Sequence, residues 1–142
     1  DHVLFYCEDI PQVLAECRRV LKDEGRFLCS TYGKQHMWEI TDLVQQFHKE
    51  IVLSAEVLYE RFGLENGENL LAPYFPEIQM RRYEDAIEIA EAEPLISYIL
   101  SCHGNQNQLL LNQYKEFREF VSARVADGFH ITKDAGIFLC RK

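Results

Sequence analysis

The chain has 142 residues, of which 47% are hydrophobic and 27% are charged, and its formal net charge at pH 7 is −8. This length and composition predict a single domain, residues 1–142, with a buried core rather than a disordered tail. The negative charge argues against nucleic-acid binding, which depends on Lys and Arg contacts to phosphate. No apolar run approaches the ~20 residues that a membrane span needs. We therefore expect a cytoplasmic protein with neither a nucleic-acid nor a membrane partner.

The cysteines and histidines show no metal-ligand spacing. The five cysteines are odd in number and form no CxxC pair, which predicts neither a disulfide framework nor a structural zinc site. Most of them fall in apolar segments, as free thiols buried in a reducing compartment do. The histidines lack HxH or HxxxH spacing, so no metal site is expected.

Residues 9–33 predict a helix, a tight turn and a strand. Asp9 and Pro11 are typical of an N-cap and a first helical turn, and apolar residues then recur every three or four positions. Gly25 is expected to end the helix in a left-handed conformation. Residues 26–31 are apolar in the middle and end in small hydroxyl residues. A helix that leads into such a strand is half of a βαβ unit, which favours a parallel sheet.

The flanking segments are predominantly helical. Residues 1–8 are either a helical turn that lines a pocket or a hydrophobic lid on the core. A helix is expected over residues 37–49, and a second runs from a cap at Ser54 to about residue 61. A short helix follows Asn66-Gly67 and closes before Pro76.

The later part of the chain predicts strands on either side of two helices. From Ile78 the apolar positions alternate and then change parity, which predicts a β-bulge or a break near Glu84-Asp85. A helix is expected over residues 93–102, and one long amphipathic helix then extends through Ala126. Two strands follow, joined by a hairpin or strand entry at Lys133-Asp134.

Three consecutive segments carry a family resemblance: DHVLFYCED at residues 1–9, RVLKDEG at 19–25 and RFLCST at 26–31. In this order they resemble the later half of a class I S-adenosylmethionine-dependent methyltransferase of the type-11 group. The resemblance implies an α/β fold with a partial Rossmann-like sheet made of the fifth, sixth and seventh strands. The seventh strand would be antiparallel and inserted between the other two. Flanking helices would form a cap from residues 36–75 and 93–127.

The family's glycine-rich cofactor loop is not in this sequence, because the seven glycines form no GxGxG cluster. The resemblance therefore implies a truncated C-terminal fragment that is inactive alone. In the full-length protein it would transfer a methyl group from S-adenosyl-L-methionine to a small-molecule acceptor. The alternative is a non-catalytic α/β interaction or dimerisation domain.

The expected site lies where the strands end, because ligands of open parallel sheets bind at the carboxyl ends of strands. His2 and His36 are the candidate catalytic bases, since imidazole titrates near neutral pH. By resemblance, Asp1 and His2 lie beside the cofactor. The remaining candidates are Phe5 and Tyr6, either as cofactor-covering aromatics or as core residues, and Thr31, Tyr32 and His36 as substrate-binding residues.

Two further expectations concern reactivity and assembly. Cys29 with His36 is a rival nucleophile–base pair, although Cys29 is expected to point from a buried strand. Without a fourth strand, the edge of residues 26–31 would be unpaired. We therefore expect a homodimer that covers this fifth-strand edge with a second copy.

Overall fold

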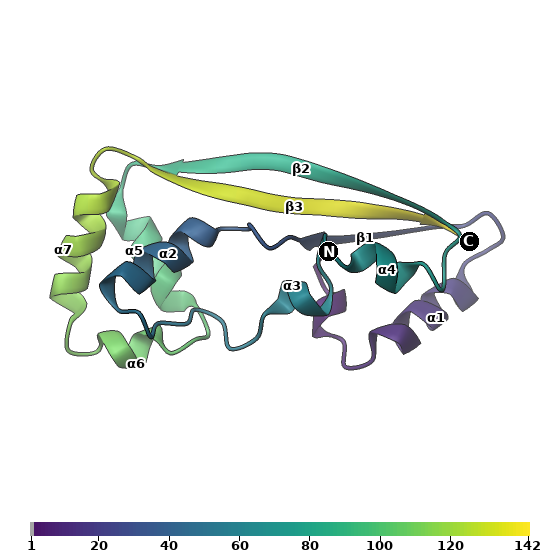
Figure 1. The fold of residues 1–142 in the computed structure, drawn as a ribbon, viewed down its shortest axis with the longest axis horizontal. Helices are drawn as coiled ribbons and strands as arrows, with labels where there is room; N and C mark the ends of the chain where they lie inside the picture. The colour runs from purple at the N-terminus through teal and green to yellow at the C-terminus, as the bar shows by residue number, and fades with distance from the viewer. Residues whose placement is uncertain (1) are drawn as a thin grey trace. The chain divides into compact units, whose positions relative to one another are not determined.

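Residues 2–142, which a computed structural model describes, form an α/β protein with seven α-helices, a short 3₁₀ helix and three strands (Figure 1). The predicted α/β class is confirmed. No helix in this range is long and apolar enough to cross a bilayer. In chain order the elements are η1 (Leu4–Tyr6), α1 (Ile10–Val20), β1 (Arg26–Tyr32), α2 (Trp38–Phe47), α3 (Leu58–Arg61), α4 (Gly67–Leu71), β2 (Glu77–Ile89), α5 (Ala92–Ser101), α6 (Gln106–Leu110), α7 (Tyr114–Val125) and β3 (Phe129–Arg141).

The chain packs as two compact units. Unit 1 contains the chain through His36, Val57–Glu84 and Asp134–Lys142, and unit 2 contains Met37–Glu56 and Asp85–Lys133. The segment 57–75, which the resemblance assigns to the helical cap, belongs to unit 1. The single domain and its cap stay predictions.

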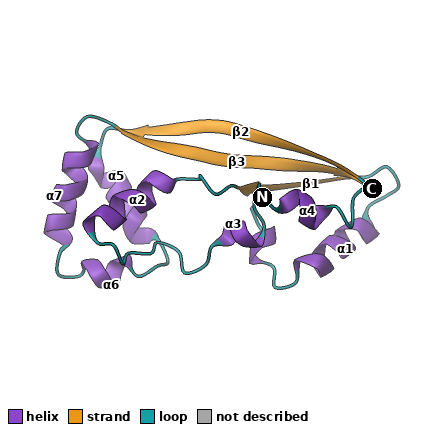
Figure 2. Ribbon diagram, in the orientation of Figure 1, coloured by secondary structure: helices purple, strands orange, loops and turns teal. Residues whose placement is uncertain are grey.

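The three strands form one sheet in the order β1-β3-β2 (Figure 2). The last strand of the chain is therefore the central one, as the resemblance implies. β1 and β3 pair antiparallel, from Arg26 opposite Arg141 to Tyr32 opposite Ala135. The parallel pairing that the helix–strand unit favours is not found between them, because β3 returns beside β1 in the opposite direction.

Helix α1 begins as predicted. The Asp9 carboxylate accepts a hydrogen bond from the Gln12 N–H at 2.9 Å, and Pro11 lies in the first turn. Both residues thus meet the needs of a helix start, where backbone N–H groups have no helical partner. The apolar stripe is buried at Leu14, which is fully shielded from solvent.

The end of α1 differs from the prediction. The helix stops at Val20, and the left-handed residue of the turn is Glu24, with φ 62°, rather than Gly25. Gly25 serves a different purpose, because a Cβ at this position would lie 2.6 Å from the Lys22 carbonyl oxygen. The glycine therefore permits a close backbone approach at the entry to β1.

β2 is continuous, so the predicted break near Glu84-Asp85 is wrong. Ion pairs near its two ends join it to β3, Glu77 with Arg141 and Glu88 with His130. The pairs are eleven residues apart on both strands, as pairing without an inserted residue requires.

The change of apolar parity along β2 has another cause. Ile78 packs against the buried core of unit 1, whereas Ile89 packs against the separate core of unit 2. The boundary between the units falls between Glu84 and Asp85. The sequence signal was real, but it marks a change of core rather than a bulge.

β3 is also one strand, so the predicted hairpin or strand entry at Lys133-Asp134 is wrong. Asp134 is buried, and its side chain and backbone are hydrogen-bonded to the loop after β1. These bonds satisfy a residue type that otherwise favours turns, and the strand continues through it.

Two helix predictions also need correction. The long helix ending at Ala126 is two helices, α6 and α7, separated after Leu110, and Leu111 between them is 77% exposed. No Gly or Pro marks this break in the sequence. Ser54 is not a helix cap: its hydroxyl donates to the Glu56 carbonyl, and α3 begins only at Leu58 without a side-chain cap.

Unit 2 has its own apolar core, and α2 is fastened to β3 by a carboxylate. Glu39 accepts a hydrogen bond from the Thr132 N–H at 2.9 Å and another from the Thr132 hydroxyl. Burial raises the pKa of Glu39, but these hydrogen bonds outweigh it and lower the pKa overall. The core contains Ile40, Leu43, Val44, Ile51, Leu95, Ile96, Ile99, Leu110, Phe117, Val121, Val125 and Ile131.

In unit 1 the core lies on one face of the sheet. Phe138 on β3 is fully buried, with its ring centroid 5.8 Å from that of Phe62. Gly67 permits this packing, because a Cβ there would lie 2.6 Å from the Phe138 ring. The opposite face of the strands is more open, as Leu28 is 54% exposed.

We predict that Phe138→Ala lowers the free energy of unfolding by about 3–5 kcal/mol, because it removes a fully buried ring and leaves a cavity. The matched control is Leu139→Ala, one residue along and on the opposite face, which we expect to cost about 1 kcal/mol. Urea unfolding followed by circular dichroism measures both. Equal losses for the two variants would contradict the assignment of the core to one face.

Candidate functional site

Three of the predicted site residues lie around a fourth, Tyr32, at the carboxyl end of β1. Its ring centroid lies 5.3 Å from that of Phe5, 6.1 Å from that of His2 and 5.0 Å from that of His36. The Tyr32 and His36 rings are nearly parallel, with an interplanar angle of 23°. The first residues of the chain and the loop after β1 are thus brought together within unit 1.

Ser30 on β1 holds His2. The His2 backbone N–H donates to Ser30 Oγ at 3.1 Å, and His2 Nδ1 lies 2.9 Å from the same oxygen. These contacts fix a residue whose backbone is left-handed, with φ 48°. When Nδ1 carries the ring proton and donates to Ser30, the basic lone pair lies on Nε2. Asp1, the neighbouring candidate, lies outside the described residues.

Three of the candidates, Thr31, Phe5 and Tyr6, differ in their exposure. Thr31 is fully buried, and its hydroxyl donates to the Phe62 carbonyl at 2.6 Å. This contact supports the end of β1 from within the core and leaves Thr31 no surface for a substrate. Phe5 is 2% exposed and Tyr6 is 65% exposed. Of the two aromatic candidates, only Tyr6 is exposed on the surface.

His36 is held by the backbone of β3. The Asp134 N–H donates to His36 Nδ1 at 3.1 Å, so Nδ1 accepts, and the neutral ring carries its proton on Nε2. A ring in this tautomer donates from Nε2 and cannot accept a proton there. The geometry therefore fits a hydrogen-bond donor better than the general base predicted from the sequence.

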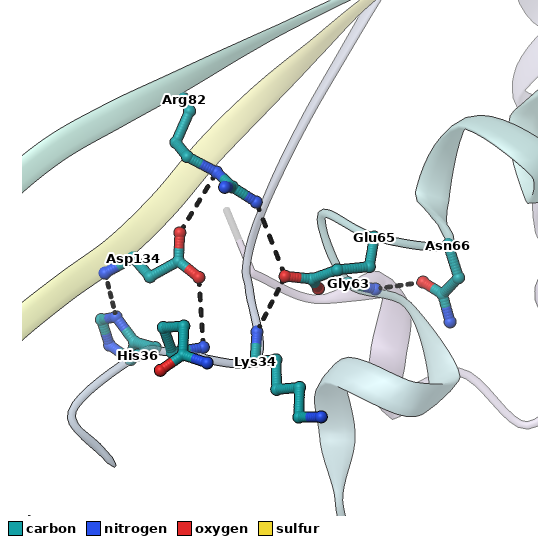
Figure 3. Close-up of polar contacts among 8 residues, drawn as sticks. Lys34, His36, Gly63, Glu65, Asn66, Arg82 and Asp134 are labelled. Carbon is teal, nitrogen blue, oxygen red and sulfur yellow. Dashed lines mark hydrogen bonds and ion pairs between the residues drawn. The ribbon is translucent and has the colours of Figure 1, made fainter. Parts of the chain in front are cut away.

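A network of charged side chains surrounds the loop after β1 (Figure 3). Asp134 Oδ2 accepts from the Gln35 N–H at 3.2 Å, and Asp134 Oδ1 lies 3.2 Å from Arg82 Nε. Glu65 Oε1 accepts from the Lys34 N–H at 3.1 Å and lies 3.5 Å from Arg82 Nη2. Arg82 thus bridges two carboxylates that both bind the backbone of the same loop.

Gly33 makes this arrangement possible. A Cβ at this position would lie 2.3 Å from Asp134 Oδ2 and 2.7 Å from Glu65 Oε1. Both carboxylates therefore approach the backbone at a place where any side chain would collide with them. The Gly33 N–H also donates to the Asp134 carbonyl at 2.9 Å, which joins the loop to β3.

The second carboxylate is oriented by its own loop. The Leu64 N–H donates to the Tyr32 carbonyl at 3.3 Å, which ties this loop to the end of β1. Asn66 Oδ1 accepts from the Gly63 N–H at 2.7 Å and closes the turn around Glu65 (Figure 3). Three segments distant in sequence thus converge on residues 33–36.

Cys29, the rival nucleophile, is a buried thiol with a raised pKa. Burial raises the pKa of Cys29 to about 12 and that of Cys140, on the paired strand, to about 11. Both thiols therefore stay protonated at neutral pH, whereas a nucleophilic cysteine needs its thiolate. In the part of the chain that the structure describes, no group of three His, Cys, Asp or Glu residues could hold a metal ion.

Comparison with protein families finds a match to the first part of this chain. A family described as a methyltransferase domain matches residues 1–29. The resemblance predicted from the sequence is thereby confirmed over η1, α1 and the start of β1. No curated protein matches the chain. The matched segment supplies His2, Phe5 and Tyr6, whereas the loop after β1 lies beyond it.

Sequence reasoning did not find the residues that hold the site together, namely Ser30, Glu65, Arg82 and Asp134. One of them left a signal. In β3, Asp134 shares its alternation with the buried Phe138 and Cys140. An acid at a core-facing position requires bonding partners, because a buried carboxylate without them is costly. The sequence around Ser30, Glu65 and Arg82 contains no comparable signal.

We predict that Arg82→Gln lowers the free energy of unfolding by about 1–3 kcal/mol, because it leaves the buried Asp134 carboxylate without its cation. Arg81→Gln, the neighbouring change on the opposite face of β2, should stay within about 0.5 kcal/mol. Chemical denaturation measures both at a low protein concentration. Similar effects of the two variants would refute the bridging role of Arg82.

Proposed function

We propose that this chain is the rear part of an S-adenosylmethionine-dependent methyltransferase that acts on a small-molecule acceptor. The family match of residues 1–29 supports a methyltransferase-type domain. The observation that carries the proposal furthest is the strand order, in which the last strand lies between the other two and runs antiparallel to β1. In this proposal β1, β2 and β3 are the fifth, sixth and seventh strands of the family's sheet.

The acceptor would bind at the carboxyl end of β1, where ligands of open sheets are held. Tyr32 and His36 lie there with stacked rings, and the network of Asp134, Arg82 and Glu65 fixes the loop that carries His36. Methyl transfer depends on alignment of the acceptor, so a rigid loop at this position serves the reaction. Thr31 would support the site from the core instead of touching the acceptor.

The cofactor would supply an electrophilic methyl group on its sulfonium. The residues described here fit only a small part of such a cofactor: Tyr6 is exposed and fits a covering role, whereas Phe5 is buried. The sequence contains no GxGxG cluster. The proposal therefore assigns most of the cofactor site to polypeptide outside these 142 residues, which alone would be inactive.

The two histidines would have different roles in an acceptor reaction that releases a proton. His2 would act as the general base in the tautomer in which Nδ1 donates to Ser30, because its basic lone pair then lies on Nε2. His36, which accepts the Asp134 N–H, would orient the acceptor. The alternative function, a non-catalytic interaction domain, is favoured by the open edge of β2, whose residues are nearly all exposed.

We predict that His2→Asn lowers turnover by about 10²–10⁴-fold and removes the acid limb of the pH–rate profile, because a general base is lost. The assay follows transfer of a labelled methyl group from S-adenosyl-L-methionine. It uses the polypeptide that is expressed together with the coding sequence 5′ to the Asp1 codon. His103→Asn is the control, since His103 lies in an exposed loop of unit 2. Unchanged turnover in His2→Asn would refute its role as base, and absence of any methyl transfer would refute the proposed function.

The cofactor part of the proposal is checked on the 142-residue chain itself. Calorimetric titration with S-adenosylhomocysteine should show no tight binding, because the glycine-rich loop is not among these residues. Submicromolar binding would contradict the assignment of the main cofactor contacts to other parts of the protein.

A further inference from the structure

β2 is an edge strand whose outer side is open. It lies at one end of the order β1-β3-β2 and extends over thirteen residues. All but its second and last residues are exposed. Among the exposed positions are three large apolar side chains: Met80 at 42%, Tyr83 at 66% and Ile87 at 38%. A long, exposed edge presents unpaired N–H and C=O groups that bind another strand.

The two faces of β2 are used differently. Arg82 points to the face of Asp134, where it forms the ion pairs described above. Arg81, Tyr83 and Asp85 share the opposite face, because successive side chains of a strand alternate. Within residues 2–142, neither Arg81 nor Asp85 has an ion-pair partner. The chain thus leaves one cation and one anion exposed on either side of an exposed tyrosine.

Residues 81–85 have the sequence Arg-Arg-Tyr-Glu-Asp, with two cations before the tyrosine and two anions after it. When a second copy of this segment runs antiparallel to the first, each cation therefore lies opposite an anion. If two copies pair antiparallel about Tyr83, Arg81 of each lies opposite Asp85 of the other. Directly opposite side chains of an antiparallel pair project from the same face within contact distance, and opposite charges at such positions are favourable. The two tyrosines then face each other at the axis. Shifting the register by two residues places Asp85 of each copy opposite Tyr83 of the other and removes both charge pairs.

We propose that a second copy of this chain docks on β2, antiparallel and in register about Tyr83. The occupant is a second copy because the charges of this segment are opposite to those of the same segment running antiparallel. A two-fold isologous contact requires such a self-complementary surface. The pairing joins the two sheets edge to edge through β2. It depends on exposure, register and charge and does not require methyl-transfer activity.

The β1 edge, through which a dimer was predicted from the sequence, is the less suitable surface. It is shorter, with seven residues, and His2 is bonded to Ser30 at its carboxyl end. Antiparallel self-pairing about its central residue, Cys29, would set Arg26 opposite Tyr32 and form no opposite-charge pair. The two edges make different predictions for substitutions in β2.

Charge variants test the proposal. Asp85→Arg sets Arg81 against a second arginine, and Arg81→Asp sets Asp85 against a second aspartate, in both symmetric contacts. Each single variant should raise the dimer dissociation constant about tenfold or more, measured by sedimentation equilibrium up to high micromolar concentration. An equimolar mixture of the two should form a heterodimer, because every opposed pair is then attractive. The double variant Arg81→Asp/Asp85→Arg should dimerise like the unchanged chain.

The outcomes separate the alternatives. A strictly monomeric unchanged chain at high micromolar concentration overturns the proposal. Dimers that persist equally in both single variants also overturn it and favour another surface such as β1. Circular dichroism establishes that each variant is folded, and recovery of association in the mixture excludes misfolding as the cause of its loss.

A crosslink tests the register itself. Tyr83→Cys places two thiols opposite each other at the axis, within reach of a disulfide bond under mild oxidation. Gln79→Cys is the control on the same face, because its partner in this register is Ile87 and the two new thiols are far apart. A disulfide dimer, located by peptide mapping, is expected for Tyr83→Cys only. Crosslinking of Gln79→Cys instead would overturn the register.

Discussion

The structure of unit 1 depends on the antiparallel pairing of β3 with β1. This pairing makes the last strand of the chain the central one and places Phe138 opposite Cys29. Alternate residues of β3 are then buried against the helices, and Phe138 contacts Phe62 within the core. The same pairing brings Asp134 to the loop after β1, where its carboxylate and backbone bind the loop. The core and the candidate site thus result from one register.

The candidate site illustrates how loops are positioned by buried charge. The loop at residues 33–36 has few apolar groups to anchor it, and its backbone N–H groups are bound by Asp134 and Glu65 instead. Arg82 compensates the two carboxylates, and Gly33 lets them approach. A buried carboxylate is costly without partners but rigid when fully bonded. The arrangement therefore holds His36 in one tautomer next to Tyr32, which is the geometry that the proposed acceptor site needs.

Much of the local structure could be predicted from the sequence, because it depends on short-range chemistry. Asp9 and Pro11 marked the start of α1, and the apolar run after Gly25 marked β1. The predictions were wrong where contacts with residues distant in the sequence determine the local structure. The polar pair Lys133-Asp134 indicates a turn, yet contacts with Arg82 and Gln35 keep it in a strand. The parity change in β2 reflects two separate cores, which no local pattern distinguishes from a bulge.

The methyltransferase proposal depends most on the strand order, in which the last strand lies between the other two and runs antiparallel to β1. Nuclear Overhauser effects between Hα protons test it directly, because such protons approach closely at every second pair of antiparallel strands. We expect cross-strand effects between β1 and β3 in the register that sets Cys29 opposite Phe138. Nuclear Overhauser effects between Hα protons of β1 and β2, or a register shifted along β3, would contradict this strand arrangement.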